Sequence, residues 1–454
     1  MTVALALVLD RADRRALGVQ LADQVRRQVT GGRLAPGDRL PSSRALAAEL
    51  GVARAVTEQA YGQLVAEGWL EGRHGSGTFV AAGAALPPRD APPRGPAAGT
   101  APLVRLDAGT PWIDPRHAAI WRRAWRDVGA ARPPAGYDDP RGLPGLRAEL
   151  AARLARLRGV DCHPDELLIT AGTADGLRNL LGVLPPGPVA VDDPGYRAAV
   201  MAVRVSGREL VDVPAPGPPP DGRTLAGCAA AYLTPAHQHP FGRTMPGRER
   251  LAALAASRAT GALLVEDDYD SEFRYDVAPV PALASLDRDR VAYLGSASKT
   301  VAPSMRLGWL IPPPALLDRL VATRAVLHDT ASWPVQRAFL SLLRDGYVDR
   351  VVRAARRVYA ARAARVTAAL APFGHVHGPV AGMYATVELP EDATRRALAA
   401  ARAAGYDVPL LAAYCRGEVR HGLIVGFGGC TDAQLDEALA ALVRGLGPWS
   451  GRRS

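Results

Sequence analysis

The sequence predicts an α/β protein in two parts: a small helical N-terminal domain that ends in a β-hairpin, and a large domain built on a mainly parallel sheet flanked by helices. Three observations lead to this prediction. Apolar residues recur at helical spacing before residue 80, a proline-rich stretch follows, and short apolar strands then alternate with helical stretches. The chain of 454 residues favours more than one domain, because single cores stop growing at roughly 250 to 300 residues.

The small domain is expected at residues 12–80. Apolar residues at four-residue spacing from Leu17 to Val29 form one helical face, and the glycines at 31 and 32 end it. Two further helices are expected, one from Ser42 or Ser43 to Gly51 and one from about Arg54 to Glu67, with a glycine-rich hairpin at residues 69–80. Three helices and a hairpin describe a winged helix-turn-helix. From the pattern alone, a helical bundle that binds no DNA is the alternative.

The motif sharpens this interpretation. Residues 32–52, with Ala60–Leu70 and Gly75–Val80, resemble the GntR-type DNA-binding domain. The resemblance implies that the third helix enters the major groove of double-stranded DNA, while the second helix and the wing hold the phosphates. The implied DNA contacts are Ser42, Ser43, Arg44, Arg54, Thr57, Arg73, Gly75 and Gly77. Ala53 departs from the family, which carries serine there, and losing that cap costs a helix ~0.5 to 2 kcal/mol.

Composition limits the other classes of protein. The net charge is +10, but residues 1–80 hold ten arginines against eight acidic residues, so DNA binding rests on the motif rather than on charge. The four cysteines are far apart and form no CxxC pair, which argues against a disulfide framework or a zinc cluster. No apolar stretch reaches the ~20 residues that a bilayer requires, and no basic segment precedes the apolar N-terminus. We expect a soluble cytoplasmic protein without a metal site.

A linker is expected at residues 81–102, which contain six prolines and little that fills a core. The large domain then spans residues 103–454. Five apolar segments are predicted to be buried strands of a parallel sheet, and they lie at residues 166–170, 188–192, 230–234, 262–266 and 290–295. Function in such sheets gathers at the carboxyl ends of the strands, so the residues that follow each strand are the candidates.

Those candidates are chemically distinctive. Lys299 follows the last of the five strands and is the only lysine beside 54 arginines. An amine can lose its proton and attack a carbonyl group, whereas a guanidinium cannot. A small-residue turn at residues 171–176, an aromatic ring at Tyr196 and an acidic run at Glu266–Tyr269 follow other strands. Alone, the small-residue turn is more often a plain tight turn than a phosphate site.

Together these residues match what pyridoxal 5'-phosphate needs. Its aldehyde needs an amine, its pyridine nitrogen a carboxylate, its phosphate a guanidinium with hydroxyl groups and helix amides, and its ring an aromatic neighbour. The surrounding motifs resemble fold-type I aminotransferases, among them Gly109-Thr-Pro, residues 137–147, Thr234-Pro-Ala-His-Gln and Arg306-Leu-Gly-Trp. The whole chain resembles a MocR-type regulator, in which a GntR domain precedes an aminotransferase-like domain with a small C-terminal α+β subdomain.

This resemblance implies roles for individual residues. Lys299 forms the Schiff base, Asp267 pairs with the pyridine nitrogen, Tyr269 bonds the ring hydroxyl and Tyr196 stacks on the ring. The implied phosphate ligands are Gly172, Thr173, Ser296, Ser298 and Arg306. Asp268 is the alternative partner for the pyridine nitrogen.

Two positions depart from working aminotransferases. His239 stands where the family carries an asparagine that bonds the ring hydroxyl, and it either donates the same bond or packs nearby. Ile424 stands where the family carries the arginine that grips the substrate carboxylate, and Arg416 and Arg420 are the candidate replacements.

The sequence therefore predicts a transcription regulator that responds to an amine, an amino acid or pyridoxal phosphate itself, with a lean toward vitamin B6 metabolism. The resemblance suggests a domain-swapped homodimer on a DNA operator. One alternative is an active aminotransferase with an appended regulatory head, which the two departures disfavour. A second is a DNA-binding protein with a cofactor-free scaffold, which the complete Schiff-base and phosphate set disfavours.

Overall fold

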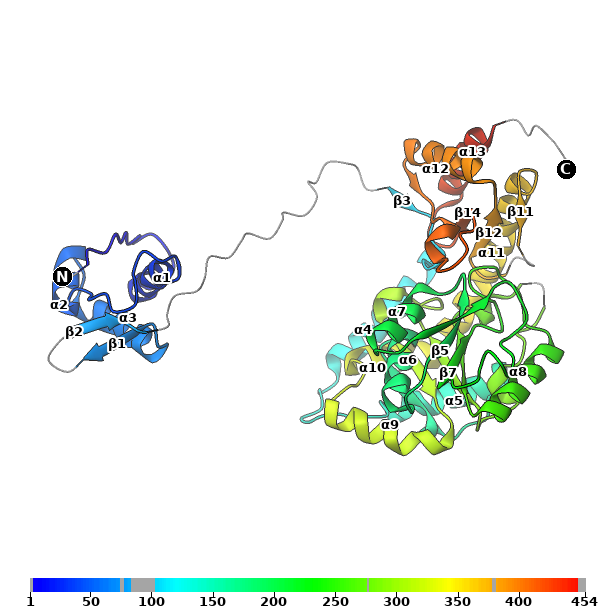
Figure 1. Ribbon diagram of the computed structural model, residues 1–454, viewed down its shortest axis with the longest axis horizontal. Helices are drawn as coiled ribbons and strands as arrows, with labels where there is room; N and C mark the ends of the chain where they lie inside the picture. Colours follow the sequence, from blue (N-terminus) through cyan, green and yellow to red (C-terminus); the bar gives the residue numbers. More distant parts are fainter. Residues whose placement is uncertain (1–2, 74–76, 83–102, 276, 378–380, 448–454) are drawn as a thin grey trace. The chain divides into compact units, whose positions relative to one another are not determined.

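The computed structural model describes residues 3–73, 77–82, 103–275, 277–377 and 381–447. The chain separates into two compact units, residues 1–100 and residues 101–454 (Figure 1). Most of the predicted linker, residues 83–102, lies outside the described residues.

The first unit is a winged helix-turn-helix. Its described elements are α1 (Leu17–Thr30), α2 (Ser43–Leu50), α3 (Arg54–Ala66), β1 (Leu70–Arg73) and β2 (Gly77–Val80). The two strands pair antiparallel. Leu21, Leu46 and Leu64, one from each helix, are fully buried in a shared core. Ser42 caps α2 by accepting a hydrogen bond from the amide of Ala45, whereas Ala53 provides no side-chain cap for α3. The predicted helices are therefore present, including the one that lacks its cap.

The second unit is built on a seven-stranded sheet with the order β4-β10-β9-β8-β7-β5-β6. These strands are β4 (Leu168–Thr170), β5 (Val189–Asp193), β6 (Leu210–Pro214), β7 (Ala230–Leu233), β8 (Leu263–Asp268), β9 (Val291–Ser296) and β10 (Gly308–Ile311). Strands β6, β5, β7, β8 and β9 are parallel, while β10 runs antiparallel between β9 and β4. The predicted mainly parallel α/β class is confirmed, and β10 is the strand of opposite direction.

Helices cover both faces of this sheet. One buried cluster joins the sheet to α6, α7 and α9, and a larger one joins it to α5, α8, α10 and α11. Their bounds are α5 (Pro144–Arg158), α6 (Thr173–Val183), α7 (Arg197–Val205), α8 (Gly247–Thr260), α9 (Pro314–Leu327), α10 (Trp333–Arg344) and α11 (Tyr347–Leu370), and α4 (Ala118–Ala130) packs on α10. Alternate residues of one strand serve the two faces: Tyr293 of β9 joins the larger cluster and Leu294 the smaller.

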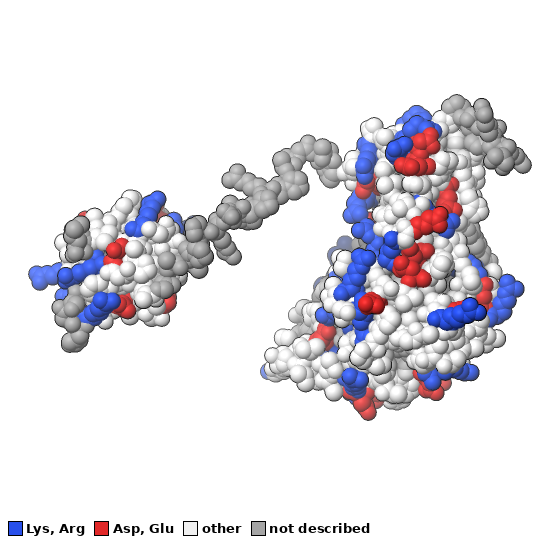
Figure 2. Space-filling view, viewed as in Figure 1, with Lys and Arg blue, Asp and Glu red and all other residues white. Residues whose placement is uncertain are grey.

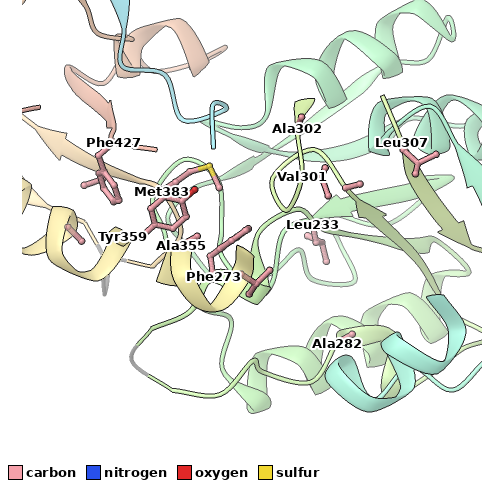
Figure 3. Close-up of a cluster of buried hydrophobic side chains, with 14 of the residues drawn as sticks. Leu233, Phe273, Ala282, Val301, Ala302, Leu307, Ala355, Tyr359, Met383 and Phe427 are labelled. Atoms are coloured by element: carbon pink, nitrogen blue, oxygen red, sulfur yellow. The ribbon is translucent and has the colours of Figure 1, made fainter. Parts of the chain in front are cut away.

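A smaller α+β subdomain completes the second unit. Strands β11 (His375–Val376), β12 (Tyr384–Glu388) and β14 (Gly422–Gly426) form an antiparallel sheet, and α12 (Glu391–Ala403) and α13 (Asp432–Leu446) pack together beside it. Strand β3 (Val104–Arg105) pairs in parallel with β13 (Tyr406–Asp407). The larger buried cluster continues into this subdomain, where Phe273, Tyr359, Met383 and Phe427 lie near one another (Figure 3). The subdomain and the main sheet therefore share one core.

Many arginines of this unit serve the fold. Arg208 donates to the carbonyl groups of four residues, Leu181, Leu184, Pro185 and Gly187. The buried Arg324 donates to Ile169 and Asp329, and the buried Arg362 donates to Phe427. Figure 2 shows basic and acidic side chains interspersed over the face of this unit that it draws. No described helix is long and apolar enough to cross a membrane.

Candidate functional site

Lys299 lies just after β9, at the carboxyl edge of the parallel strands. Its side-chain Nζ donates a 2.6 Å hydrogen bond to the carbonyl oxygen of Gly109. Burial lowers the pKa of the Lys299 amine, and the carboxylates of Asp270, Asp107 and Asp267 partly oppose this effect. A buried amine whose pKa lies below its usual value is easier to deprotonate, which is the state that attacks a carbonyl group.

Asp267 lies near the end of β8 and is almost fully buried. Its Oδ2 accepts a 2.5 Å hydrogen bond from the Tyr232 hydroxyl, while its Oδ1 has no hydrogen-bond partner among the described residues. Burial raises the pKa of the Asp267 carboxyl to about 7, although the neighbouring Tyr232 and Thr173 lower it. A buried carboxyl group with a free oxygen and no cationic partner fits a protonated ring nitrogen.

Asp268, the alternative for this role, is occupied elsewhere. Its Oδ2 accepts from Arg158 Nε at 2.5 Å and from the Tyr293 hydroxyl at 2.6 Å, and its Oδ1 accepts from the Ser271 amide at 3.3 Å. Successive residues of a strand point to opposite faces, which separates these neighbouring acids. Asp268 therefore belongs to a buried structural ion pair, and Asp267 is the better candidate.

An anion cradle lies at the amino end of α6. Gly172 precedes this helix with φ +114°, a conformation that favours glycine. A β-carbon on Gly172 would lie 3.6 Å from Nη2 of Arg306, so the guanidinium is beside the helix terminus. No hydrogen bond or ion pair engages this guanidinium within the described part of the chain. Helix amides and a free guanidinium are the groups that bind a phosphate dianion.

The serines that precede Lys299 shape the same turn. Ser296 Oγ accepts a 2.9 Å hydrogen bond from the Ser298 amide, and Thr173 acts on the charge of Asp267. The backbone amide of Thr173 lies at the amino end of α6.

Aromatic and imidazole rings form another wall. Tyr196, at the start of α7, meets the ring of His239 edge to face at a centroid distance of 5.6 Å. Burial lowers the pKa of His239 to about 3, so this ring is neutral at pH 7. Its Nδ1 lies 3.3 Å from the Tyr384 hydroxyl, and its Nε2 has no partner among the described residues. His239 Nε2 and Asp267 Oδ1 are thus both buried polar atoms that are free to bond a ligand.

Tyr269 is engaged differently from the expected role. Its hydroxyl lies 2.8 Å from the Tyr384 hydroxyl and donates to the His237 carbonyl at 2.9 Å. His237 Nδ1 in turn lies 2.7 Å from Asp270 Oδ2. A bond from Tyr269 to a ring hydroxyl therefore requires this small network to rearrange.

The position where aminotransferases carry the arginine that binds the substrate carboxylate is apolar in this chain. Ile424 is fully buried in a cluster with Ala108, Ala215, Phe241, Tyr384 and Leu411. Both candidate arginines have partners elsewhere in the fold. Arg416 bonds Asp212 and the carbonyl groups of Val191 and Asp192. Arg420 pairs with Glu388, donates to the Ala215 carbonyl and covers the ring of Phe241. Both side chains are thus engaged in contacts within the fold.

The DNA-binding candidates divide into exposed and buried groups. Ser42, Arg44, Arg54 and Arg73 are exposed and Ser43 is half-buried, while Gly75 lies outside the described residues. Gly77 has φ +108°, and a β-carbon there would lie 3.2 Å from Arg39 Nε. Arg73 pairs with Glu71 and covers Phe79. Arg54 pairs with Glu58 one turn along α3, at 2.7 Å.

Thr57 requires a correction. It is fully buried, and its hydroxyl donates to the carbonyl groups of Ser43 and Arg54. The side chain therefore joins α3 to α2 instead of facing a groove. A repeat of apolar residues fixes which face of a helix is buried only approximately, and a threonine at the edge of that face can lie on either side.

Some site residues were missed from the sequence. Tyr232 lies in a strand that was predicted from its apolar residues, and its hydroxyl is the one feature that could have marked it. His237 lies in the motif Thr234-Pro-Ala-His-Gln. Asp107 lies two residues before Gly109, and no motif marks it.

Comparison with known proteins agrees with these two units. Residues 17–80 match the family described as bacterial regulatory proteins, gntR family, and residues 101–442 match aminotransferase class I and II. Among solved structures, the α-aminoadipate aminotransferase LysN from Thermus thermophilus is 25% identical with a TM-score of 0.66, covering 76% of this chain and 92% of its own. An archaeal alanine:glyoxylate aminotransferase is 24% identical with a TM-score of 0.69, and the match covers 76% of this chain and 90% of the other.

Several proteins that match this chain over most of its length are named as regulators. The HTH-type pyridoxine biosynthesis transcriptional regulator PdxR of Corynebacterium glutamicum is 34% identical, over 97% of this chain and 98% of its own. The probable rhizopine catabolism regulatory protein MocR of Rhizobium meliloti is 33% identical, over 78% of this chain and 77% of its own. TauR of Rhodobacter capsulatus, an HTH-type transcriptional regulator, is 33% identical over 77% of this chain and 79% of its own.

Proposed function

The chain belongs to the MocR-type HTH transcriptional regulators, in which a GntR DNA-binding domain precedes an aminotransferase class I and II domain, and from this we propose how it works. It binds pyridoxal 5'-phosphate through Lys299. It changes its binding to operator DNA when an amine, an amino acid or pyridoxal phosphate itself reaches that site.

One observation carries the cofactor proposal. Asp267 is a buried carboxyl group whose Oδ1 is unpaired among the described residues, and its charge acts on the Lys299 amine. An unpaired buried polar atom costs about 1 to 3 kcal/mol unless a ligand bonds it. The free Arg306 guanidinium beside the α6 terminus supplies the second requirement, because it fits the phosphate of the same ligand.

Each residue then has a defined task. Bound pyridoxal phosphate supplies an aldehyde that exchanges between amines and a ring that withdraws electrons. Lys299 provides the resident amine, and Asp267 keeps a proton on the ring nitrogen. Gly172, Thr173, Ser296, Ser298 and Arg306 hold the phosphate, while Tyr196 and the neutral His239 contact the ring. Tyr269 bonds the ring hydroxyl once it leaves Tyr384.

The proposed effector leans toward a vitamin B6 compound. The buried cluster around Ile424 offers no cation to a carboxylate, and both nearby arginines are engaged. An amino acid would bury its carboxylate there without a partner, which is unfavourable. A full-length relative is named for regulation of pyridoxine biosynthesis, which supports the same choice.

We further propose a domain-swapped homodimer that reads two DNA half-sites in the cytoplasm. Tyr137 is 83% exposed and stacks on His328 at 3.8 Å, beside Val326 and Leu327, which are 79% and 67% exposed. Exposed apolar groups of this kind are typical of subunit contacts. The exposed Arg44, Arg54 and Arg73 carry the DNA contact of each copy.

Two measurements test the proposal on the full chain. Absorbance after addition of pyridoxal phosphate, followed by candidate amines, reports on the site, and a mobility shift on the upstream DNA of its own gene reports on regulation. We expect amine exchange together with altered DNA affinity. Sustained turnover of an amino donor with a keto acid would favour the alternative, an active aminotransferase with a regulatory head. If neither pyridoxal phosphate nor amines change DNA binding, the sensor proposal is wrong.

A further inference from the structure

The N-terminal arm of the second unit, residues 103–111, connects the chain that follows the linker to the reactive lysine. The Val104 amide donates to the Gly405 carbonyl and the Leu106 amide to the Asp407 carbonyl, each at 2.9 Å. The Gly426 amide donates to the Leu106 carbonyl at 2.8 Å. The arm is therefore bound along its length to β13 and β14 of the smaller subdomain.

Glycines after and within β14 bring this arm into close backbone contact. A β-carbon on Gly426 would lie 1.9 Å from the Asp107 carbonyl oxygen, and one on Gly428 would lie 2.3 Å from the Thr110 carbonyl oxygen. Only glycine permits such an approach. The arm therefore has no room to move toward β14.

Lys299 joins this arm to the main sheet. It follows β9 of the main sheet, yet its Nζ donates to Gly109 of the arm at 2.6 Å. Asp107 shapes the turn that presents this carbonyl group, because its Oδ1 accepts from the Gly109 amide at 2.8 Å and from Thr110 Oγ1 at 3.0 Å. The same carboxylate acts on the charge of the lysine.

We propose that Asp107 is a positioning residue for Lys299, and that the hydrogen bond from Lys299 to Gly109 holds the arm only while the lysine amine is free. The second half rests on the function proposed above. When a primary amine condenses with an aldehyde, a C=N bond forms, the carbonyl oxygen leaves as water and the nitrogen keeps at most one hydrogen. A neutral nitrogen in such a bond carries no hydrogen, so Gly109 would lose its donor and the arm would be released at this point.

The consequence for regulation follows from chain connectivity. The arm continues directly into residues 83–102, which join it to the DNA-binding unit. Reaction and release of the Lys299 amine thus change the restraint on the residues that lead to the DNA-binding unit. The same contact couples the main sheet to the smaller subdomain, because Lys299 follows β9 of the main sheet and the arm is bound to the subdomain.

The charges that face Lys299 set the direction of the test. Asp267 and Asp270 face it from β8 and the turn that follows, Asp107 from the arm, and the neutral His239 from the segment after β7. All three carboxylates favour the ammonium form, against burial. Replacing Asp107 with asparagine keeps an acceptor oxygen for the turn and removes one negative charge, so the pKa of Lys299 should fall further.

Hydrogen exchange of the full chain, with no pyridoxal compound present, tests the contact itself. We expect the amides of residues 104–110 to exchange several-fold faster in Lys299→Ala and in Asp107→Ala than in the unmodified chain. The amides of α13 serve as the internal reference and should not change. Unchanged exchange in residues 104–110 of both variants overturns the proposal, whatever the cofactor does.

The pH dependence of pyridoxal phosphate attachment, trapped with borohydride, tests the positioning role. Asp107→Asn should move the pH–rate profile to lower pH by about half a unit or more. At a pH below the pKa of the lysine, the attachment rate should therefore rise about threefold. Asp221→Asn is the matched control, because exposed Asp221 Oδ1 accepts from the amide and hydroxyl of Thr224, each at 2.9 Å, in a similar turn.

The outcomes are distinguishable. If the Asp107→Asn profile superimposes on that of Asp221→Asn, the positioning role is refuted. If no variant attaches pyridoxal phosphate to Lys299, the proposed function fails, and hydrogen exchange alone then decides whether the lysine holds the arm.

Discussion

Replacing Asp267 with asparagine should stabilise the chain that lacks pyridoxal phosphate. Burial raises the pKa of this carboxyl from its usual 3.8 to about 7. A raised acid pKa means that the folded chain binds a proton more tightly than the unfolded chain does. The resulting stability is fully present below about pH 4 and is lost as the pH rises through 7.

The size of the effect follows from the same pKa. Moving it from 3.8 to about 7 corresponds to on the order of 4 kcal/mol, at about 1.36 kcal/mol per pH unit. Asparagine carries no charge at any pH and still offers an oxygen to the Tyr232 hydroxyl. Asp267→Asn should therefore raise the free energy of unfolding at pH 8 by up to this amount, with little change near pH 4.

Pyridoxal phosphate should reduce the difference in stability between the two chains. Ionised Asp267 gains a charge-assisted hydrogen bond to the protonated ring nitrogen, about 1.5 to 3 kcal/mol, and asparagine does not. The cofactor should thus stabilise the unmodified chain more than the variant. Calorimetry of the transition of the second unit, at pH 5 and pH 8 with and without cofactor, measures all of these differences.

Asp268→Asn is the matched control. It removes the negative charge that pairs with the buried Arg158, so it should cost about 3 to 5 kcal/mol at pH 5 and at pH 8. The two adjacent substitutions therefore act in opposite directions at pH 8. A cofactor-free Asp267→Asn chain that is less stable than the unmodified chain at pH 8 would refute the reasoning.

Other predictions concern separate parts of the molecule. Borohydride reduction of the cofactor-loaded chain should label one lysine position, and Lys299→Ala should abolish the absorbance of the lysine adduct. Its persistence would exclude Lys299. Arg306→Ala should weaken pyridoxal phosphate about tenfold or more and pyridoxal little, because only the former carries a phosphate, and equal losses by titration would argue against the cradle. Thr57→Val should lower the free energy of unfolding of the first unit by about 1 to 2 kcal/mol, whereas Arg54→Ala should leave it unchanged and weaken DNA binding in a mobility shift. Val326→Asp should convert a dimer to a monomer in sedimentation, and an unchanged mass would place the interface elsewhere.

Much of the fold was accessible from the sequence because buried parallel strands are short runs of apolar residues. The segments predicted at residues 188–192, 262–266 and 290–295 correspond to β5, β8 and β9. Strand β10 was not predicted, and its place in the sheet depends on pairing with β9 and with β4, which lies far away in sequence. Strand β6 is only partly buried, so its apolar pattern is weak.

The site was less accessible, because it depends on which way side chains point. Strand-end reasoning selects Asp267 and Asp268 alike, and only the packing of Arg158 and Tyr293 distinguishes them. Likewise, nearness in sequence to the missing carboxylate grip favoured Arg416 and Arg420. Each is engaged by an acid that lies near it only in the folded chain, Asp212 for Arg416 and Glu388 for Arg420. Long-range partners of this kind leave no local pattern.

The carbonyl-bonding arginines of the second unit have a consequence for chemical modification. Arg208 satisfies four carbonyl groups with one planar side chain, a geometry that a lysine ammonium does not provide. With guanidinium groups in every other basic position, acylating enzymes and metabolites find a single side-chain amine, Lys299. Lysine acylation of this protein has no silent side-chain target: each such event would occupy the proposed sensory site.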